Sequence, residues 1–95
     1  MFEWDSKKAG SNEAKHGVSF EEASRAFFDP GGLDGEDLAH SVKEERRYRL
    51  AQSVDGNLLV IVYTIRSRGH EKTIRLISAR LANRKEKTRY QEAED

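Results

Sequence analysis

The sequence predicts a small α+β domain in the order β-α-α-β-β-β-β-α, with helices on one side of an antiparallel sheet. Three observations support this fold class. Two helix-capping sequences start at Ser19 and Asn83, Asp55-Gly56 separates two apolar runs, and the runs that follow are rich in β-branched residues. The 95 residues, 36% of them hydrophobic, suffice for a single core, so we expect one domain over residues 1–95.

The first strand is predicted at Phe2–Asp5, where apolar and polar side chains alternate. Asp5 or Ser6 can cap a helix that runs to about Lys15, and Gly17 stands in the usual terminating place. This pattern predicts a strand followed closely by a helix.

A second helix is predicted from the capping box Ser19-Phe20-Glu21-Glu22 through Phe28, with Val18 as the staple residue. Its apolar stripe begins at Phe20. The sequence Asp29-Pro30-Gly31-Gly32 then ends the helix.

The sheet is predicted mainly from the second half of the chain. Residues 33–37 suit a short edge strand, 46–54 and 58–66 a hairpin, and 73–80 a further strand. The continuously apolar run 58–63 predicts the central strand. The capping box at Asn83 and Glu86 opens a final helix to about Glu92, and the tail 91–95 is expected to fray.

The hairpin register follows from the turn. If Asp55-Gly56 is a two-residue type I′ turn, paired residue numbers sum to 111. Arg47 then faces Thr64, Arg49 faces Val62 and Glu45 faces Arg66, all on one face, while the other face is largely apolar. A longer turn such as residues 54–57 would change this register.

Charge is segregated along a chain whose net charge is zero. From Thr64 to Tyr90 there are nine Lys or Arg against two Glu, a local charge of +7. Residues 1–63 carry −4 and residues 91–95 carry −3. Such segregation is typical of a cationic face that binds a nucleic-acid backbone, although a solvated surface gives the same pattern.

Cationic groups at the open end of a sheet suit phosphodiester chemistry, because arginine forks match phosphate geometry and stay charged. For proton transfer the candidates are His16, His40, His70, Glu45 and the tyrosines. His16 is interpreted as structural and His70 as surface, while His40 is open between a catalytic and a solvated role. Three scattered histidines do not form a metal site, and no nucleotide-cofactor motif occurs, so neither a metal nor a cofactor is expected.

Composition also bears on location. The chain has no cysteine, a charged N-terminus unlike a signal peptide, and no apolar run of membrane-spanning length. We therefore expect a cytoplasmic protein without a membrane partner.

These residues together resemble the BrnT family, the toxins of BrnT–BrnA type II toxin–antitoxin pairs. The resemblance extends from Phe2 to about Tyr90. It rests on these blocks: 2–5, Lys8-Ala9, Asn12, 15–23, Asp29-Pro30, His40-Ser41, Glu45-Arg46, Tyr63-Thr64, 77–80, Glu86 and Tyr90. Two departures are Ala51, where glycine is common, and Asp37-Leu38-Ala39, which replaces an acidic run before His40.

The resemblance implies a RelE-like ribonuclease fold and inhibition of translation by RNA cleavage. It also implies a BrnA-like antitoxin with a ribbon-helix-helix domain, with which the toxin would bind operator DNA and repress its own operon. DNA would be reached only through that complex.

The resulting hypothesis is a metal-independent endoribonuclease. Arg47, Arg66 and Arg80 would hold the scissile phosphate, with His40 as the first proton-transfer candidate and Glu45 as the second. Further RNA contacts are assigned to Arg49, Arg75, Arg84 and Lys85.

Arg80 raises a difficulty, because regular alternation would place it on the same side as Ile74 and Leu76, toward the core. A break near Ser78 must release it. The alternative role for Arg80 is a salt bridge to Glu86.

A second function remains open: a non-catalytic nucleic-acid- or antitoxin-binding module with a RelE-like fold. The helix pair around Gly17 superficially suggests a helix-turn-helix. Its second helix, however, begins with Glu21 and Glu22, where recognition helices offer donors to DNA.

Overall fold

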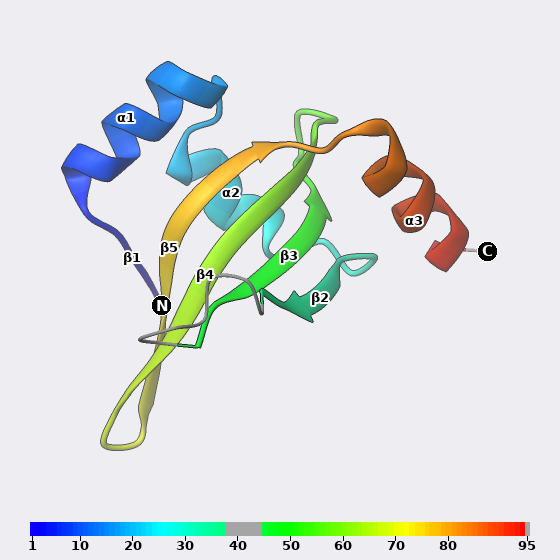
Figure 1. Ribbon diagram of the computed structural model, residues 1–95. Helices are drawn as coiled ribbons and strands as arrows, with labels where there is room; N and C mark the ends of the chain where they lie inside the picture. Colours follow the sequence, from blue (N-terminus) through cyan, green and yellow to red (C-terminus); the bar gives the residue numbers. More distant parts are fainter. Residues whose placement is uncertain (38–44, 95) are drawn as a thin grey trace.

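The computed structural model describes residues 1–37 and 45–94 and shows the predicted order of elements (Figure 1). The helices are α1 (Ser6–His16), α2 (Phe20–Ala26) and α3 (Arg84–Glu94). The strands are β1 (Phe2–Glu3), β2 (Leu33–Glu36), β3 (Arg47–Gln52), β4 (Leu58–Arg68) and β5 (Glu71–Leu81). They form one sheet in the order β1-β5-β4-β3-β2, with β4 in the centre as predicted.

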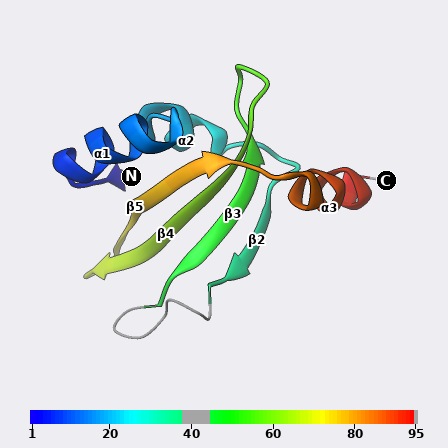
Figure 2. The ribbon, with the colours of Figure 1, turned by 45° about the horizontal axis from the view of Figure 1, so that its top comes forward.

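The α+β fold class is confirmed, with two differences in arrangement. Strand β1 runs parallel to β5, so the sheet is mixed. The helices occupy both faces, whereas one face was expected: α1 and α2 lie together on one side, and α3 lies apart beyond β2 (Figure 2).

Two hydrophobic clusters show why the helices divide in this way. On the α1–α2 face, Phe20 and Ala23 of α2 pack with Ile61, Leu76 and other residues. On the opposite face, Tyr90 of α3 packs with Leu50, Val60 and Ala82. The α3 face is the one that carries Tyr48, Leu50, Val60, Val62, Ser78 and Arg80. Because Tyr90 is 5% exposed, it anchors α3 to a face that a purely local pattern does not specify.

The helix boundaries follow the predicted capping residues. Asp5 caps α1 by accepting hydrogen bonds from the backbone N–H groups of Lys7 and Lys8, and Gly17 ends the helix in the left-handed conformation with φ 71°. Ser19 caps α2 through the N–H of Glu22, at 3.1 Å. Asn83 and Glu86 form a reciprocal box, with bonds of 2.8 and 2.9 Å. Local side-chain chemistry thus fixes where the helices begin.

The β3–β4 turn differs from the prediction. The connection is the three-residue loop Val54–Gly56, in which the N–H of Gly56 donates to the carbonyl of Ser53 and Gly56 adopts φ 86°. This is a type I turn followed by a left-handed glycine. Paired residue numbers therefore sum to 110, with Arg47 opposite Tyr63 and Arg49 opposite Ile61.

The predicted register was wrong by one residue, and the assignment of faces changes with it. Arg47 and Arg49 share the α1–α2 face with Tyr63 and Ile61. Arg66, paired with Thr73, lies on the same face as Val62, which is the α3 face. The arginines expected together on one face are therefore divided between two.

Strand β5 contains the break that was required near Ser78. Val62 pairs with Ser78 whereas Tyr63 pairs with Leu76, so Ile77 is an extra, unpaired residue at a β-bulge. The bulge reverses the alternation of the residues that follow it. Ile74 and Leu76 face α1 and α2, while Arg80, paired with Val60, faces the other way.

Where the short strand β1 ends, the side chain of Asn12 replaces it as the hydrogen-bonding partner of β5. The amide of Asn12, 7% exposed, donates to the carbonyl of Ala79 at 2.8 Å and accepts from its N–H at 3.1 Å. The same amide donates to the carbonyl of Val18 at 3.0 Å. One buried side chain therefore joins α1 to the edge of β5.

Candidate functional site

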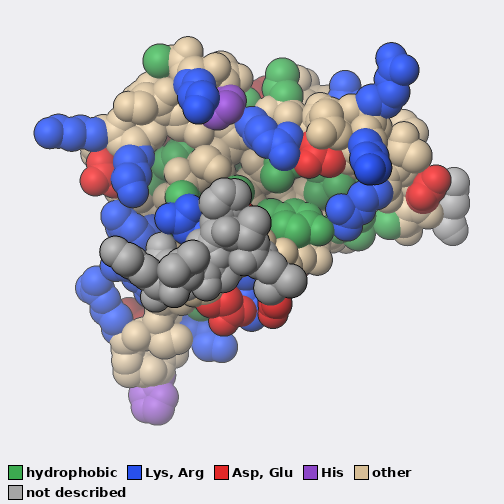
Figure 3. All heavy atoms as spheres, in the orientation of Figure 1, with side chains coloured by type: hydrophobic (Ala, Val, Ile, Leu, Met, Phe, Trp, Pro, Cys, Tyr) green, Lys and Arg blue, Asp and Glu red, His purple; other side chains and the backbone are tan. Residues whose placement is uncertain are grey.

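A hollow of about 410 Å³ lies on the α3 face. Its lining comprises Asp37, Tyr48, Leu50, Val60, Val62, Ser78, Arg80, Glu86 and Arg89. Strand residues provide a largely apolar floor, and the polar side chains come from β5, from α3 and from the end of β2. Hydrophobic side chains are visible in this region, with Lys and Arg around them, on the face shown in Figure 3.

Arg80 is held at the rim of the hollow by Glu86. Its Nη1 and Nη2 atoms donate to the two carboxylate oxygens of Glu86, both at 2.9 Å. Hydrogen bonds from Arg80 hold the pKa of Glu86 below its usual range, against the opposing effect of burial. Glu86 also accepts the N–H of Asn83, so the cap of α3 and the orientation of Arg80 share one carboxylate.

Tyr48 is positioned by contacts on two sides. A Cβ atom on Gly35 would lie 2.5 Å from the Cζ atom of Tyr48, so the ring rests on the bare backbone of β2. Arg89 of α3 donates to the Tyr48 hydroxyl at 3.2 Å, and its Cζ atom lies 5.9 Å from the ring centroid. The ring is therefore held against an edge strand, with a cation beside its hydroxyl end.

Further cations lie on or near the α3 face. Arg75, opposite Thr64, forms a 2.5 Å ion pair with Glu3. Arg66 is exposed near the distal end of β4. Arg84 and Lys85 are exposed in the first turn of α3. The structure thus brings Arg80 and Arg89 to the hollow and places Arg66, Arg75, Arg84 and Lys85 at other points.

Glu45 and Arg47 form a pair of their own at the start of β3. Arg47 Nη2 lies 2.8 Å from Glu45 Oε1, and both side chains are substantially exposed. The carbonyl of Glu45 accepts the hydroxyl of Thr64 at 2.8 Å. Glu45 therefore interacts with Arg47 in the structure, whereas the predicted register placed it opposite Arg66.

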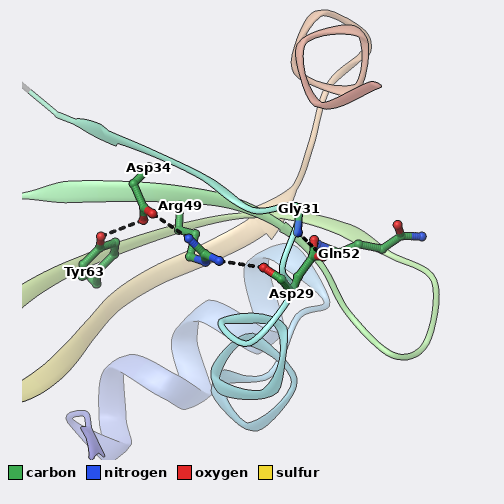
Figure 4. Close-up of polar contacts among 6 residues, drawn as sticks. All are labelled: Asp29, Gly31, Asp34, Arg49, Gln52 and Tyr63. Atoms are coloured by element: carbon green, nitrogen blue, oxygen red, sulfur yellow. Dashed lines mark hydrogen bonds and ion pairs between the residues drawn. The ribbon is translucent and has the colours of Figure 1, made fainter. Parts of the chain in front are cut away.

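Arg49 lies in a different environment from the other predicted RNA-binding residues. Its side chain, 14% exposed, pairs with Asp34 at 2.6 Å and donates to the carbonyl of Asp29 at 2.7 Å (Figure 4). Its Cζ atom lies 5.4 Å from the ring centroid of Phe27. These contacts join the end of α2, β2 and β3, and they face away from the hollow.

The same network controls the ionisation of Tyr63 and Asp29. Burial and a hydrogen bond to Asp34 raise the pKa of Tyr63 to about 12, so the hydroxyl remains a donor. Burial opposes the ionisation of Asp29, but hydrogen bonds from Tyr90, Gln52 and Gly31 outweigh it and lower the pKa. Asp29 stays ionised and links α3 to β3.

His40 lies outside the described residues. Sequence reasoning counted Tyr48 only among the tyrosines open to proton transfer, because the two-residue turn placed it on the largely apolar face, and it assigned no role to Arg89. In the correct register, alternation along β3 places Tyr48 on the α3 face. The two hydrophobic clusters, one on each face of the sheet, show that α3 and Arg89 lie on that face as well.

Residues 4–86 match the family model described as the ribonuclease toxin BrnT of type II toxin–antitoxin systems. This chain belongs to the BrnT family. A similar solved structure is the ribonuclease toxin BrnT of Brucella abortus, with a TM-score of 0.63 and 21% identity. The match covers 88% of this chain and 99% of that one. No curated protein matches the chain.

Membership in the BrnT family makes this protein the toxin component of a type II toxin–antitoxin system, with an antitoxin as partner. Across residues 1–37 and 45–94, no group of three His, Asp or Glu side chains is arranged to hold a metal ion. None of the helices in the described part of the chain has the length and hydrophobicity needed to cross a membrane.

Proposed function

We propose that this BrnT-family protein is a cytoplasmic, metal-independent endoribonuclease that inhibits translation by cleaving RNA on its α3 face. The observation that carries the proposal is the position of Arg80. A bulge turns it away from the core, and it stands at the rim of a hollow with its guanidinium held by Glu86.

The orientation of Arg80 suits a phosphate. Glu86 takes the Nη1–Nη2 end of the guanidinium, and no described residue bonds to Nε. The edge formed by Nε and Nη2 therefore remains for a bidentate contact with two phosphate oxygens. Such a fork stabilises the extra negative charge that develops on the phosphorane during attack by the RNA 2′-hydroxyl.

The other predicted residues have distinct proposed roles. Arg80 would contact the scissile phosphate. Arg66 lies six residues along β4 from Val60, the partner of Arg80, so it would bind a neighbouring phosphate of the same strand, as would Arg75, Arg84 and Lys85. His40 stays the first proton-transfer candidate from the sequence. Glu45 is the second, and Arg47, which pairs with it, would hold its carboxylate in place.

Mutation of the two proposed phosphate ligands tests this function. Arg80→Ala is expected to lower RNA cleavage by about 100- to 1,000-fold, since a transition-state contact of this kind contributes roughly 3–4 kcal/mol. Arg66→Ala should weaken RNA binding and thereby lower cleavage when RNA is scarce. Both variants should also relieve growth inhibition. Lys7→Ala removes an equal charge from an exposed position on α1 and should change neither.

The melting temperature of each variant separates lost chemistry from lost folding. If folded Arg80→Ala and Arg66→Ala proteins remain fully active, the cationic site is wrong. Wild-type protein that binds RNA without cleaving it would favour the non-catalytic module.

Metal independence has its own test. The wild-type protein should cleave RNA at an unchanged rate in EDTA. Loss of activity on chelation and its recovery on addition of a divalent ion would contradict the metal-free mechanism.

We further propose that the antitoxin is a BrnA-like ribbon-helix-helix protein and that the complex represses its own operon. Family membership supports the existence of an antitoxin. Co-purification with the product of a neighbouring short reading frame, followed by operator gel shift, tests its type. The toxin alone should not shift the operator, whereas the complex should.

A further inference from the structure

We propose that the hollow on the α3 face is a subsite for one nucleobase of single-stranded RNA, which stacks on Tyr48 and Arg89. The inference rests on the proposed function and deepens it, because it identifies how the chain recognises part of its substrate. It concerns base binding, whereas the proposed function concerns phosphate chemistry.

The size and lining of the hollow suit a single flat, partly apolar group. Its volume of about 410 Å³ lies near the lower end of the range for small-molecule pockets, roughly 300–1,000 Å³. Leu50, Val60 and Val62 provide an apolar floor, and the Ser78 hydroxyl adds a polar group. A nucleobase has apolar faces and polar edges, as this lining requires.

Tyr48 supplies an aromatic ring whose place is set before any ligand arrives. Gly35 permits the ring to lie directly on β2, because any side chain at that position would collide with it. The bond from Arg89 to the hydroxyl restrains the ring from the α3 side. A ring held in this way loses little conformational freedom when a base stacks on it.

Two arginines, Arg80 and Arg89, and two acidic residues, Asp37 and Glu86, line the hollow, and Glu86 is already bound to Arg80. The arginines offer donors for the phosphate of an RNA nucleotide. Arg80 and Arg89 flank the apolar floor, and a base placed there would have its phosphate within reach of the Nε–Nη2 edge of Arg80. Guanidinium groups also stack on bases, so Arg89 can serve as a second platform. Tyr48 is partly exposed, and an accessible aromatic ring beside cations is the usual arrangement in proteins that bind single strands.

The test uses the full chain and a short 2′-O-methyl RNA, which cannot be cleaved because its 2′-hydroxyls are blocked. A library of such oligonucleotides carries one abasic nucleotide at each position in turn. With the wild-type protein, we expect the abasic substitution at one position to weaken binding by roughly 5- to 150-fold, the range for loss of one base–aromatic stack. A 2-aminopurine at that position should change in fluorescence on binding.

Two pairs of variants connect the effect to the hollow. Tyr48→Ala should remove the abasic penalty, whereas Tyr48→Phe, which keeps the ring, should retain it. Arg89→Ala should weaken binding and reduce the penalty. Lys87→Ala removes a charge from an exposed position of the same helix outside the hollow and should preserve the penalty.

The outcomes are decisive even if Tyr48→Ala does not fold, because the abasic series uses wild-type protein and Arg89 is exposed. The inference is overturned if no abasic position matters, if no oligonucleotide binds, or if folded Tyr48→Ala and Arg89→Ala keep the full penalty. Base-dependent binding without cleavage of natural RNA would uphold the subsite and reject the nuclease. Cleavage without base dependence would do the reverse.

Discussion

At the scale of the residue, two arginines that look alike in the sequence occupy unlike surroundings. Arg80 stands at the rim of the hollow, bound to one carboxylate. Arg49 is enclosed by Asp34, the Asp29 carbonyl and the Phe27 ring. Residue type alone predicts a phosphate contact for both, but only burial and partners distinguish a ligand candidate from a structural clamp.

Arg49→Ala is expected to destabilise the protein by roughly 2–3 kcal/mol, because it leaves Asp34 without its cation and removes the stacking on Phe27. Urea unfolding measures this loss. Arg68→Ala, at an exposed end of β4, should change stability by less than about 0.5 kcal/mol. Equal stability of Arg49→Ala and wild type would show that the clamp is unimportant and would return Arg49 to the RNA-binding candidates.

Gly32→Ala should act through the same clamp. The new Cβ atom would collide with Nη2 of Arg49, and moving the guanidinium would break its bonds to Asp34 and to the carbonyl of Asp29. We expect a loss of about 1–3 kcal/mol in urea unfolding. Gly10→Ala is the matched control: it meets open space in the middle of α1 and should stabilise by about 0.5–1 kcal/mol.

At the scale of the element, the sequence predicted the features that depend on neighbouring residues, but not those that depend on pairing between distant segments. Asp5, Gly17, Ser19 and Asn83 cap the helices as predicted, because each acts within a few residues of itself. The turn at Asp55-Gly56 is compatible with two loop lengths. Ser53 and Asn57 are both held by Glu22, a residue of α2 far away in sequence, which helps to fix the longer loop.

The candidate site was likewise predicted only where neighbouring residues determine it. Sequence reasoning located Arg80 and the need for a break near Ser78, since strict alternation made the problem visible. It did not place Tyr48 or α3 on the site's face. That placement depends on Tyr90 packing against Leu50 and Val60, and no local pattern encodes the contact.

Asp29 should make the joint between α2, β3 and α3 sensitive to acid. Its lowered pKa means that its contribution to stability is fully present above the usual value of 3.8 and is lost as pH falls through the lower value in the folded state. Asp29→Asn should cost about 1–3 kcal/mol at pH 7 and clearly less near pH 2, measured by urea unfolding at both. A cost that is independent of pH would contradict this role.

At the scale of the whole molecule, the sheet separates the larger hydrophobic cluster from the proposed RNA-binding face. Its α1–α2 face holds the larger cluster and the Arg49 clamp, while its α3 face carries the hollow and Arg66, Arg75 and Arg80. The bulge at Ile77 places Leu76 on the first face and Arg80 on the second, whereas regular alternation would put both on one face. The segregation of charge along the sequence becomes a spatial one, since the cationic segment 64–90 forms the C-terminal part of β4, all of β5 and much of α3.

Binding of non-cleavable RNA should depend steeply on salt. If Arg66, Arg75 and Arg80 each neutralise one phosphate of a single strand, the slope of log K against log salt should be about −2. Arg75→Ala should reduce that slope by about 0.7, while Lys7→Ala should leave it unchanged. Affinity that stays constant from low to physiological salt would mean that this face is not used for RNA.

The Asn12 amide also bears on how copies of this protein meet one another. Unpaired N–H and C=O groups on a sheet edge can recruit a strand from another molecule, which starts aggregation. Asn12 occupies both groups of Ala79 where β1 no longer covers β5. A side chain that satisfies both groups leaves this part of the edge unable to pair with a strand of another copy.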